Sequence, residues 1–298
     1  MVIAQSLRER PVEDLDRGDH VCLAFADDAE QRRVVSAYLS AGLSRGERVL
    51  YFADQQRPST VLRWLRSAGV DPGPALTRGQ LRVVTADDSY LAAGGFDAAT
   101  MVETLEREVD ASLAAGYTGF RVSGEMGWGL RDIPGADQLA AYETAVNAVF
   151  ESRPASAICQ YDARLFSPAE LRVFDRCHPG AVELEPVYRH GLLRIVPAFR
   201  DGERALRVVG TVDLRTTGAL VDALEAALRW PGDVVVDMGA LEFIDLAGLR
   251  ALAHAARRLP AGRRLRVVDL APPLCHVIGL AGFDRHPALV VTPRGAGA

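Results

Sequence analysis

Short, largely apolar runs alternate with longer stretches of helical periodicity through residues 19–179 of the chain. Continuous apolar runs of this kind are typical of strands that helices cover on both faces, as in parallel sheets. The predicted strands lie at residues 20–25, 48–52, 81–84, 119–123 and 157–161. The alternation therefore predicts a series of βαβ units around a parallel sheet.

The stretches between these strands carry apolar residues at helical spacing, for example Val35, Leu39 and Gly42 after the first strand. Further helices are predicted at residues 98–115, 135–152 and 168–177. The last of these has a clear start, because Ser167 can cap it and Pro168 suits its first turn.

Residues 180–191 interrupt the alternation, because Glu183, Glu185 and Pro186 break the apolar pattern. We interpret this segment as a linker between two domains. The predicted divisions are an N-terminal segment at 1–18, a first domain at 19–179, the linker at 180–191, a second domain at 192–292 and a tail at 293–298.

The second domain has a different order of elements. Two apolar runs flank a polar turn at residues 200–203, which predicts a β-hairpin, and strands then alternate with helices. The predicted strands are at 192–199, 205–209, 233–237, 265–268 and 288–291, with helices at 247–259 and 272–279 and a further helix marked by Leu214, Val221, Leu224 and Leu228. We therefore expect two α/β domains, the first built on a parallel sheet and the second on a mixed sheet with helices.

Charge and composition narrow the chemistry of this chain. The formal net charge is −5 and the pI is near 5.7, so there is no electrostatic footprint for wrapping nucleic acid, and we expect no direct nucleic-acid partner. All 34 basic residues are arginine. The absence of lysine excludes a Schiff-base lysine and a P-loop lysine.

Four cysteines lie far apart in the sequence, at Cys22, Cys159, Cys177 and Cys275. The chain opens with polar and charged residues rather than a signal-peptide core, and no run approaches the roughly 20 apolar residues of a membrane span. We expect a cytoplasmic protein without a membrane partner.

A strand end turns into a helix at residues 243–250, beside Asp245. The Asp245 carboxylate is placed to accept hydrogen bonds from the first free amides of a helix that begins near Ala247. Gly248 allows close approach of another segment, and Leu246 projects from the first turn. Taken alone, this turn is also compatible with a plain helix cap followed by core leucines.

This turn, together with the strand exit at residues 210–214, resembles the STAS (sulfate transporter and anti-sigma factor antagonist) family over residues 192–291. In that family a serine or threonine follows the aspartate and is phosphorylated by a partner kinase, whereas this chain has Leu246. The resemblance implies a surface that docks an anti-sigma factor or a kinase-like regulator without phosphorylation at the usual position. The implied docking residues are Asp213, Asp245, Leu246, Ala247, Gly248 and Leu249.

The first domain resembles a RecA/KaiC-like ATPase without its phosphate-binding loop. Residues 26–31 follow the first strand, and they are acidic and free of glycine, so they cannot readily cradle phosphates. Four short motifs instead resemble the MEDS family of sensory domains. The motifs lie at residues 18–22, 121–128, 159–162 and 177–179. The resemblance implies sensing of a small molecule or a stress signal, coupled to an output domain.

Candidate site residues gather at strand ends and in the loops that follow them, where ligands bind in parallel sheets. Glu125, Trp128 and Tyr161 offer a charge and two aromatic walls to a small organic ligand. His20, Cys22, Cys159 and His178 form a conceivable soft-metal or redox site, because Cys22 and Cys159 lie on strands that are neighbours in a RecA-like order. Ordinary core packing of these cysteines, histidines and aromatic rings remains the alternative, and we expect no cofactor.

These observations favour a non-enzymatic signalling regulator, in which a sensory domain responds to a ligand or a redox state and controls a STAS domain. A degenerate RecA-like domain that keeps nucleotide binding or redox chemistry is the competing hypothesis. A scaffold that senses nothing is the third.

Overall fold

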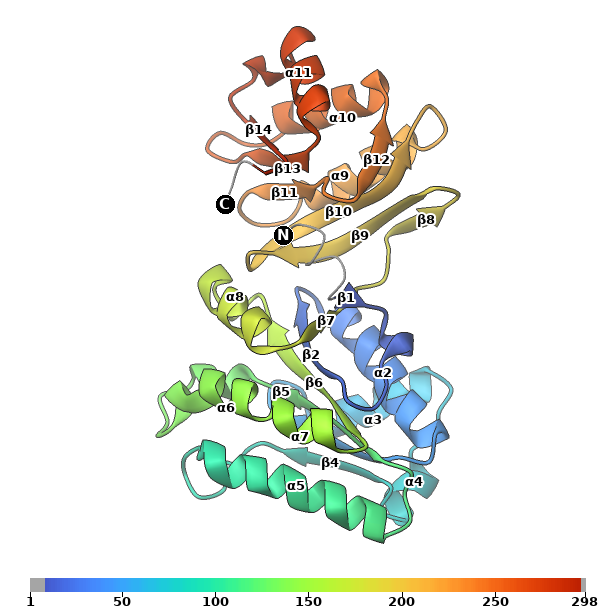
Figure 1. The fold of residues 1–298 in the computed structure, drawn as a ribbon, viewed down its shortest axis with the longest axis vertical. Helices are drawn as coiled ribbons and strands as arrows, with labels where there is room; N and C mark the ends of the chain where they lie inside the picture. The colour runs from blue at the N-terminus through green and yellow to red at the C-terminus, as the bar shows by residue number, and fades with distance from the viewer. Residues whose placement is uncertain (1–8, 296–298) are drawn as a thin grey trace. The chain divides into compact units, whose positions relative to one another are not determined.

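The computed structural model describes residues 9–295, and the chain divides into two compact units between Glu183 and Leu184. Each unit has its own sheet and its own core, and each is described by itself below (Figure 1).

The first unit is built on a seven-stranded sheet in which every pair of neighbours is parallel. The strand order is β1-β7-β2-β6-β5-β3-β4. The strands are β1 (Glu9–Arg10), β2 (His20–Phe25), β3 (Arg48–Ala53), β4 (Leu81–Thr85), β5 (Phe120–Glu125), β6 (Ala155–Asp162) and β7 (Gly180–Val182). The predicted parallel sheet is confirmed, and β2 and β6 are neighbours, with Cys22 opposite Cys159.

Helices cover both faces of this sheet (Figure 1). On one face of the sheet, α2 packs on α3. On the other face, α5 packs on α6 and α7, and α6 also packs on α8. The helices are α2 (Asp28–Ser44), α3 (Pro58–Ser67), α4 (Gly73–Thr77), α5 (Ala98–Ala114), α6 (Leu139–Ala145), α7 (Asn147–Ser152) and α8 (Pro168–Cys177). The single helix predicted at 135–152 is therefore two helices that meet at Val146. The predicted start of α8 is confirmed by a capping box between Ser167 and Glu170.

The interpretation of residues 180–191 as a linker is wrong at both ends. β7 pairs with β1 and β2 in the first sheet, and β8 (Tyr188–His190) pairs antiparallel with β9 in the second. Only residues 183–187 lie between these two strands. Each strand has three residues, too few to show a periodic pattern, and the charged residues beside them hide the apolar Gly180–Val182. The two-residue strand β1 lies inside the predicted N-terminal segment and was not predicted, also because it is too short to show a pattern. Residues 1–8 of that segment lie outside the described residues.

The second unit is a mixed sheet in the order β14-β13-β11-β10-β9-β8, with β12 also paired to β10. Its other elements are β9 (Leu193–Arg200), β10 (Glu203–Val212), α9 (Thr217–Ala227), β11 (Val234–Asp237), β12 (Leu241–Ile244), α10 (Leu246–Arg257), β13 (Leu265–Leu270), α11 (Pro272–Leu280) and β14 (Leu289–Pro293). The predicted hairpin is confirmed. Asp201 and Gly202 both have positive φ, which suits a two-residue turn between twisted strands.

Two predictions in this unit need correction. Leu214 was assigned to an amphipathic helix, but α9 begins only at Thr217 and the Leu214 side chain is 87% exposed. The strand β12 was not predicted, because it is short and two of its four residues, Glu242 and Phe243, are exposed. Within the predicted tail, β14 extends to Pro293, and residues 296–298 lie outside the described residues.

None of the helices in residues 9–295 is long and apolar enough to cross a membrane.

An ion pair inside the first unit joins β5 to the segment before β3. Arg121 donates from Nε to Glu47 at 2.6 Å, and both side chains are almost completely buried. The Arg121 guanidinium also donates to the Tyr38 carbonyl and lies 4.4 Å from the centre of the Tyr38 ring. A buried pair of this kind is costly to break, because the remaining charge is left in a low-dielectric interior.

We expect Arg121→Leu to lower the free energy of unfolding by about 3–5 kcal/mol, because Glu47 is left as an uncompensated buried charge. Urea denaturation measures the change. Arg82→Leu is the matched control, since Arg82 pairs with Glu108 at a more exposed position and its loss should cost no more than about 1 kcal/mol. Equal losses in the two variants would contradict the assignment.

Candidate functional site

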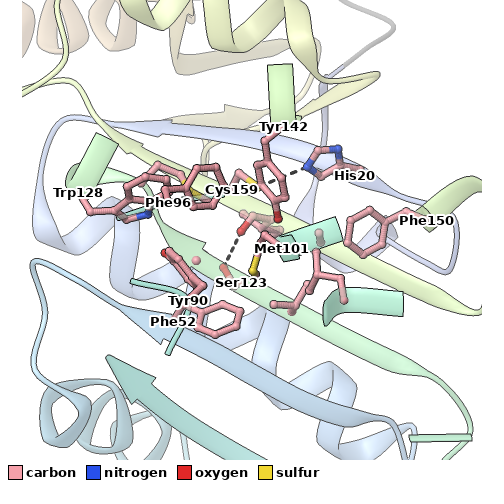
Figure 2. A pocket seen from close by; sticks show the side chains of 16 residues that line it. His20, Phe52, Tyr90, Phe96, Met101, Ser123, Trp128, Tyr142, Phe150 and Cys159 are labelled. Carbon is pink, nitrogen blue, oxygen red and sulfur yellow. Dashed lines mark hydrogen bonds between the residues drawn. The ribbon is translucent and has the colours of Figure 1, made fainter. Parts of the chain in front are cut away.

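A small apolar cavity lies inside the first unit, between the sheet and the helices α5, α6 and α7 (Figure 2). Its volume is about 20 Å³, which is room for a single water-sized molecule. The cavity is lined by His20, Phe52, Tyr90, Phe96, Met101, Leu105, Val122, Ser123, Gly124, Met126, Trp128, Tyr142, Phe150, Ala157, Ile158 and Cys159. The lining is mostly aromatic and aliphatic, so the cavity suits an apolar molecule.

Two polar atoms in this aromatic wall have no hydrogen-bond partner among the described residues. They are the Tyr90 hydroxyl and the Trp128 indole nitrogen, and both are buried. The two rings meet edge to face with their centres 5.4 Å apart, and Phe96 packs against both. Buried polar groups are normally hydrogen-bonded, so these two groups are an exception within the cavity wall.

A wider groove lies next to the cavity, along β4 and α5, with a volume of about 510 Å³. Phe52, Tyr90, Met101 and Leu105 line both the cavity and the groove. These four side chains therefore form the wall between them. Methionine and leucine change rotamer at modest cost, so this wall can open to admit a ligand.

A cluster of four ionisable side chains lies at one end of the cavity: His20, Glu143, Cys159 and His178. Their ligating atoms all lie within 4.8 Å of one another, and all four residues are buried. Figure 2 shows His20 and Cys159 in contact at the cavity wall, at 3.3 Å between Nε2 and Sγ. Burial raises the pKa of the Cys159 thiol well above its usual value, which disfavours a role as a free nucleophile.

Glu143 is the acidic member of this cluster. Burial alone would raise the pKa of its carboxyl group, but the charges and hydrogen bonds of His178 and His20 outweigh burial and hold it well below the usual value. Burial also lowers the pKa of His20. The sequence interpretation missed Glu143, because no motif surrounds this acidic residue of α6 and only the fold brings it to the two histidines.

The seven residues predicted for a ligand site separate into three groups. Three of them line the cavity: His20, Trp128 and Cys159. His178 belongs to the cluster, together with His20 and Cys159. Tyr161 donates its hydroxyl to Glu143 at 2.6 Å and stacks on Phe174. Cys22 and Glu125 belong to neither the cavity nor the cluster.

Glu125 instead holds the loop after β3. Its carboxylate accepts hydrogen bonds from the backbone amides of Asp54, Gln55 and Gln56 and from the Tyr51 hydroxyl. Burial raises the pKa of this carboxyl, and the four hydrogen bonds oppose the rise. The arrangement is that of a structural anchor rather than a catalytic base.

The segment that would hold phosphate in a RecA-like ATPase is occupied by the chain's own carboxylates. Asp27 accepts hydrogen bonds from the amides of Ala29 and Glu30, and Glu30 accepts one from the amide of Ala26. The amide donors at the start of α2 therefore serve carboxylates, in a place where phosphate would otherwise bind.

In the second unit, the residues predicted to dock a partner lie at the start of α10 and at the end of β10. Asp245 caps α10, with its carboxylate 2.8 Å from the Gly248 amide, so the predicted cap is confirmed. Leu246 is 55% exposed, whereas Gly248 and Leu249 are buried and cannot contact a partner directly. Asp213 and Ala247 are partly exposed.

Gly248 is buried because the strand ends crowd it. A methyl group at this position would lie 2.6–2.9 Å from side-chain carbons of Ile244 and Val212. These contacts are closer than real methyl groups show, so the helix approaches β10 and β12 only because residue 248 is glycine.

Two further apolar side chains accompany Leu246. Phe243 is 52% exposed on β12, and Leu214 follows the neighbouring strand β10. We call Leu214, Phe243 and Leu246 the apolar patch. The sequence interpretation missed the patch, because Leu214 was assigned to a helix and Phe243 was treated only as part of a strand end.

Comparison with known families matches both units. The family model described as MEDS, "MEthanogen/methylotroph, DcmR Sensory domain", matches residues 19–179, and the model described as "Mlab, STAS domain" matches residues 195–292. The chain is therefore a sensory domain followed by a STAS domain. It belongs to the MEDS family, and the predicted resemblance to both families is confirmed.

The similar curated proteins are regulators. The chain is 27% identical over 155 residues to the transcriptional repressor DcmR of Methylorubrum extorquens, a match that covers 52% of this chain and 56% of DcmR. It is also 29% identical over 105 residues to the anti-sigma-F factor antagonist RsfB of Mycobacterium tuberculosis, covering 35% of this chain and 86% of RsfB. The chain thus spans little more than half the length of DcmR.

Two solved structures are similar to parts of the chain. A KaiC-like protein from Pyrococcus horikoshii matches with a TM-score of 0.42 and 13% identity, over 64% of this chain and 89% of that protein. An anti-sigma factor antagonist from Mycobacterium paratuberculosis matches with a TM-score of 0.30 and 29% identity, over 33% of this chain and 85% of that protein.

We expect Glu125→Ala to lower the free energy of unfolding by about 2–3 kcal/mol, because it leaves three part-buried backbone amides and the buried Tyr51 hydroxyl without their acceptor. Glu125→Gln should recover most of the loss, since its amide oxygen can still accept from the loop amides. Urea denaturation of both variants checks this. If Glu125→Ala is as stable as Glu125→Gln, the Glu125 side chain does not anchor the loop.

Proposed function

We propose that this chain is a cytoplasmic signalling regulator. Its MEDS domain binds a small molecule, and binding controls whether the STAS domain engages an anti-sigma factor or a kinase-like regulator. The observation that carries the proposal is the apolar cavity with two buried donors, Tyr90 and Trp128, that lack partners among the described residues.

The cavity defines the class of ligand. The closed cavity of about 20 Å³ holds one water-sized molecule, so an organic ligand enters only when the wall shared with the groove moves, and the aromatic walls then favour an apolar body. The Tyr90 hydroxyl and the Trp128 N–H are both able to donate. The ligand that fits best is a small organic molecule with one hydrogen-bond acceptor, which enters from the groove along α5.

The STAS domain supplies the output. The apolar patch is exposed beside the partly exposed carboxylates of Asp213 and Asp245. A central apolar contact with a polar rim is typical of protein interfaces. Leu246 cannot accept phosphate, so control of this surface comes from access to it and not from its modification.

The two domains are linked by a short segment that begins close to the sensory site. His178 belongs to the buried cluster, and β7 starts two residues later at Gly180. A ligand that shifts the cavity wall at His20 also shifts the neighbouring His178, since their ring centres are 4.3 Å apart. We propose that this displacement reaches residues 183–187 and changes the availability of the apolar patch.

The ligand assignment predicts a specific role for the Tyr90 hydroxyl. Acetone, acetamide, ethanol and formamide are suitable probes, and we expect at least one to raise the melting temperature of the full chain. Tyr90→Phe should weaken its binding about tenfold, the equivalent of one hydrogen bond, without unfolding the protein. Tyr117→Phe is the matched control, because the Tyr117 hydroxyl bonds the Arg78 carbonyl away from the cavity. Unchanged affinity in Tyr90→Phe would remove the hydroxyl from the site.

The docking assignment predicts that charge in the apolar patch abolishes partner binding. Leu246→Glu should reduce capture of the partner by at least about 100-fold, because a carboxylate must be desolvated without a counter-charge. Leu280→Glu is the control, since Leu280 is a 77% exposed leucine on α11, outside the patch. Paired affinity capture followed by mass spectrometry measures both. Equal recovery with the two variants, or a captured protein unrelated to anti-sigma factors and their kinases, would contradict the proposal.

A further inference from the structure

Four potential metal ligands converge in the interior of the sensory domain from four separate parts of the chain. His20 comes from β2, Glu143 from α6, Cys159 from β6, and His178 from the residue after α8. Neither histidine is exposed by more than 1%, and Glu143 is fully buried. Sequence proximity does not explain the convergence, because the fold alone brings the four together.

In each histidine the Nδ1 atom lies within hydrogen-bond distance of an oxygen acceptor. His20 Nδ1 lies 2.6 Å from the side-chain oxygen of Asn147, whose own NH₂ group donates to the Cys177 carbonyl. His178 Nδ1 lies 2.7 Å from the Phe174 carbonyl. Each Nδ1 therefore donates to its oxygen acceptor, and both Nε2 atoms face the Glu143 carboxylate in the cluster. Hydrogen bonds of this kind orient histidine ligands in metalloproteins.

The carboxylate of Glu143 is arranged in the same way. Its Oε1 accepts the Tyr161 hydroxyl at 2.6 Å, while its Oε2 faces the two histidine rings. That second oxygen lies 3.2 Å from His20 Nε2 and 3.3 Å from His178 Nε2. A buried carboxylate oxygen this close to two imidazole nitrogens needs a positive charge beside it, which either a protonated ring or a metal ion supplies.

We propose that His20, Glu143, Cys159 and His178 bind one Zn²⁺ ion, in a site that goes beyond the small-molecule cavity assigned above. Zn²⁺ binds nitrogen, oxygen and sulfur at about 2.0–2.3 Å in a tetrahedron, which places neighbouring ligand atoms about 3.3–3.7 Å apart. Three of the pairs here are already close to that spacing, at 3.2, 3.3 and 3.3 Å.

The composition of the site favours zinc over the cations that prefer oxygen ligands. Mg²⁺ and Ca²⁺ require several oxygen ligands, and this site has one carboxylate. A thiolate with two imidazoles suits Zn²⁺, and a thiolate and a carboxylate together neutralise its charge in the dry interior.

This proposal changes the set of ligands considered from sequence. Cys22, which the sequence interpretation grouped with His20 and Cys159, lies opposite Cys159 on the neighbouring strand but outside the cluster. Glu143 replaces Cys22 as the fourth ligand. The ligand set with Cys22 and the ligand set with Glu143 are therefore distinguishable with one pair of cysteine variants.

The test uses the purified full chain, stripped with a chelator and reloaded with Zn²⁺ or with Co²⁺ as a spectroscopic probe. After gel filtration we expect on the order of one metal ion per chain by atomic emission. Bound Co²⁺ should show the intense visible bands of a tetrahedral ion and a sulfur-to-cobalt charge-transfer band. Cys159→Ser should abolish the charge-transfer band, and Glu143→Gln, nearly isosteric, should weaken binding at least tenfold.

Cys22→Ser is the matched control, because Cys22 is a buried cysteine of the same sheet and should keep full metal content and the same spectrum. Circular dichroism of each metal-free variant distinguishes loss of the site from loss of the fold. Failure of the folded wild type to retain either metal would overturn the proposal and leave the cluster as a buried ion pair. Loss of the charge-transfer band in Cys22→Ser with retention in Cys159→Ser would overturn the ligand set. Neither result depends on the small-molecule experiment.

Discussion

The burial of the Glu143 carboxylate is the constraint on which the interior of the sensory domain depends. A charge inside a protein is tolerated only when cations and hydrogen bonds surround it. Here Tyr161 satisfies one oxygen, and His20 and His178 face the other. These partners come from β6, β2 and the end of α8, so the requirement of one carboxylate ties together the centre of the sheet and the segment that leads out of it.

The same constraint connects the cavity to the rest of the chain. His20 and Cys159 belong both to the cavity wall and to the cluster around Glu143. A packed interior transmits displacement because it has few voids to absorb it. His178 packs against His20, and it lies two residues before β7, whose last residue directly precedes the segment at 183–187. One set of packed side chains therefore connects the cavity wall to the start of that segment.

The sequence predicts the repetitive parts of this fold and misses the parts that depend on single contacts. The strands β2 to β6 and the helix start at Ser167 follow from apolar runs and capping chemistry. The cavity could be predicted only in part. Trp128 was found from its place after a strand, but Tyr90 lies in a loop between β4 and α5, and no periodic pattern places it against Trp128.

The turn at the start of α10 shows why an apolar residue can stand where a phosphorylated one is expected. Asp245 caps the helix, and Gly248 allows it to lie against Ile244, so the turn holds its shape without any charge at residue 246. Leu246 is therefore presented as a fixed, neutral contact in a patch with Leu214 and Phe243. Under the proposed function, control acts on access to this surface, because residue 246 has no charge state to change. The cavity and the buried cluster of the first unit are then where we propose that the signal is received.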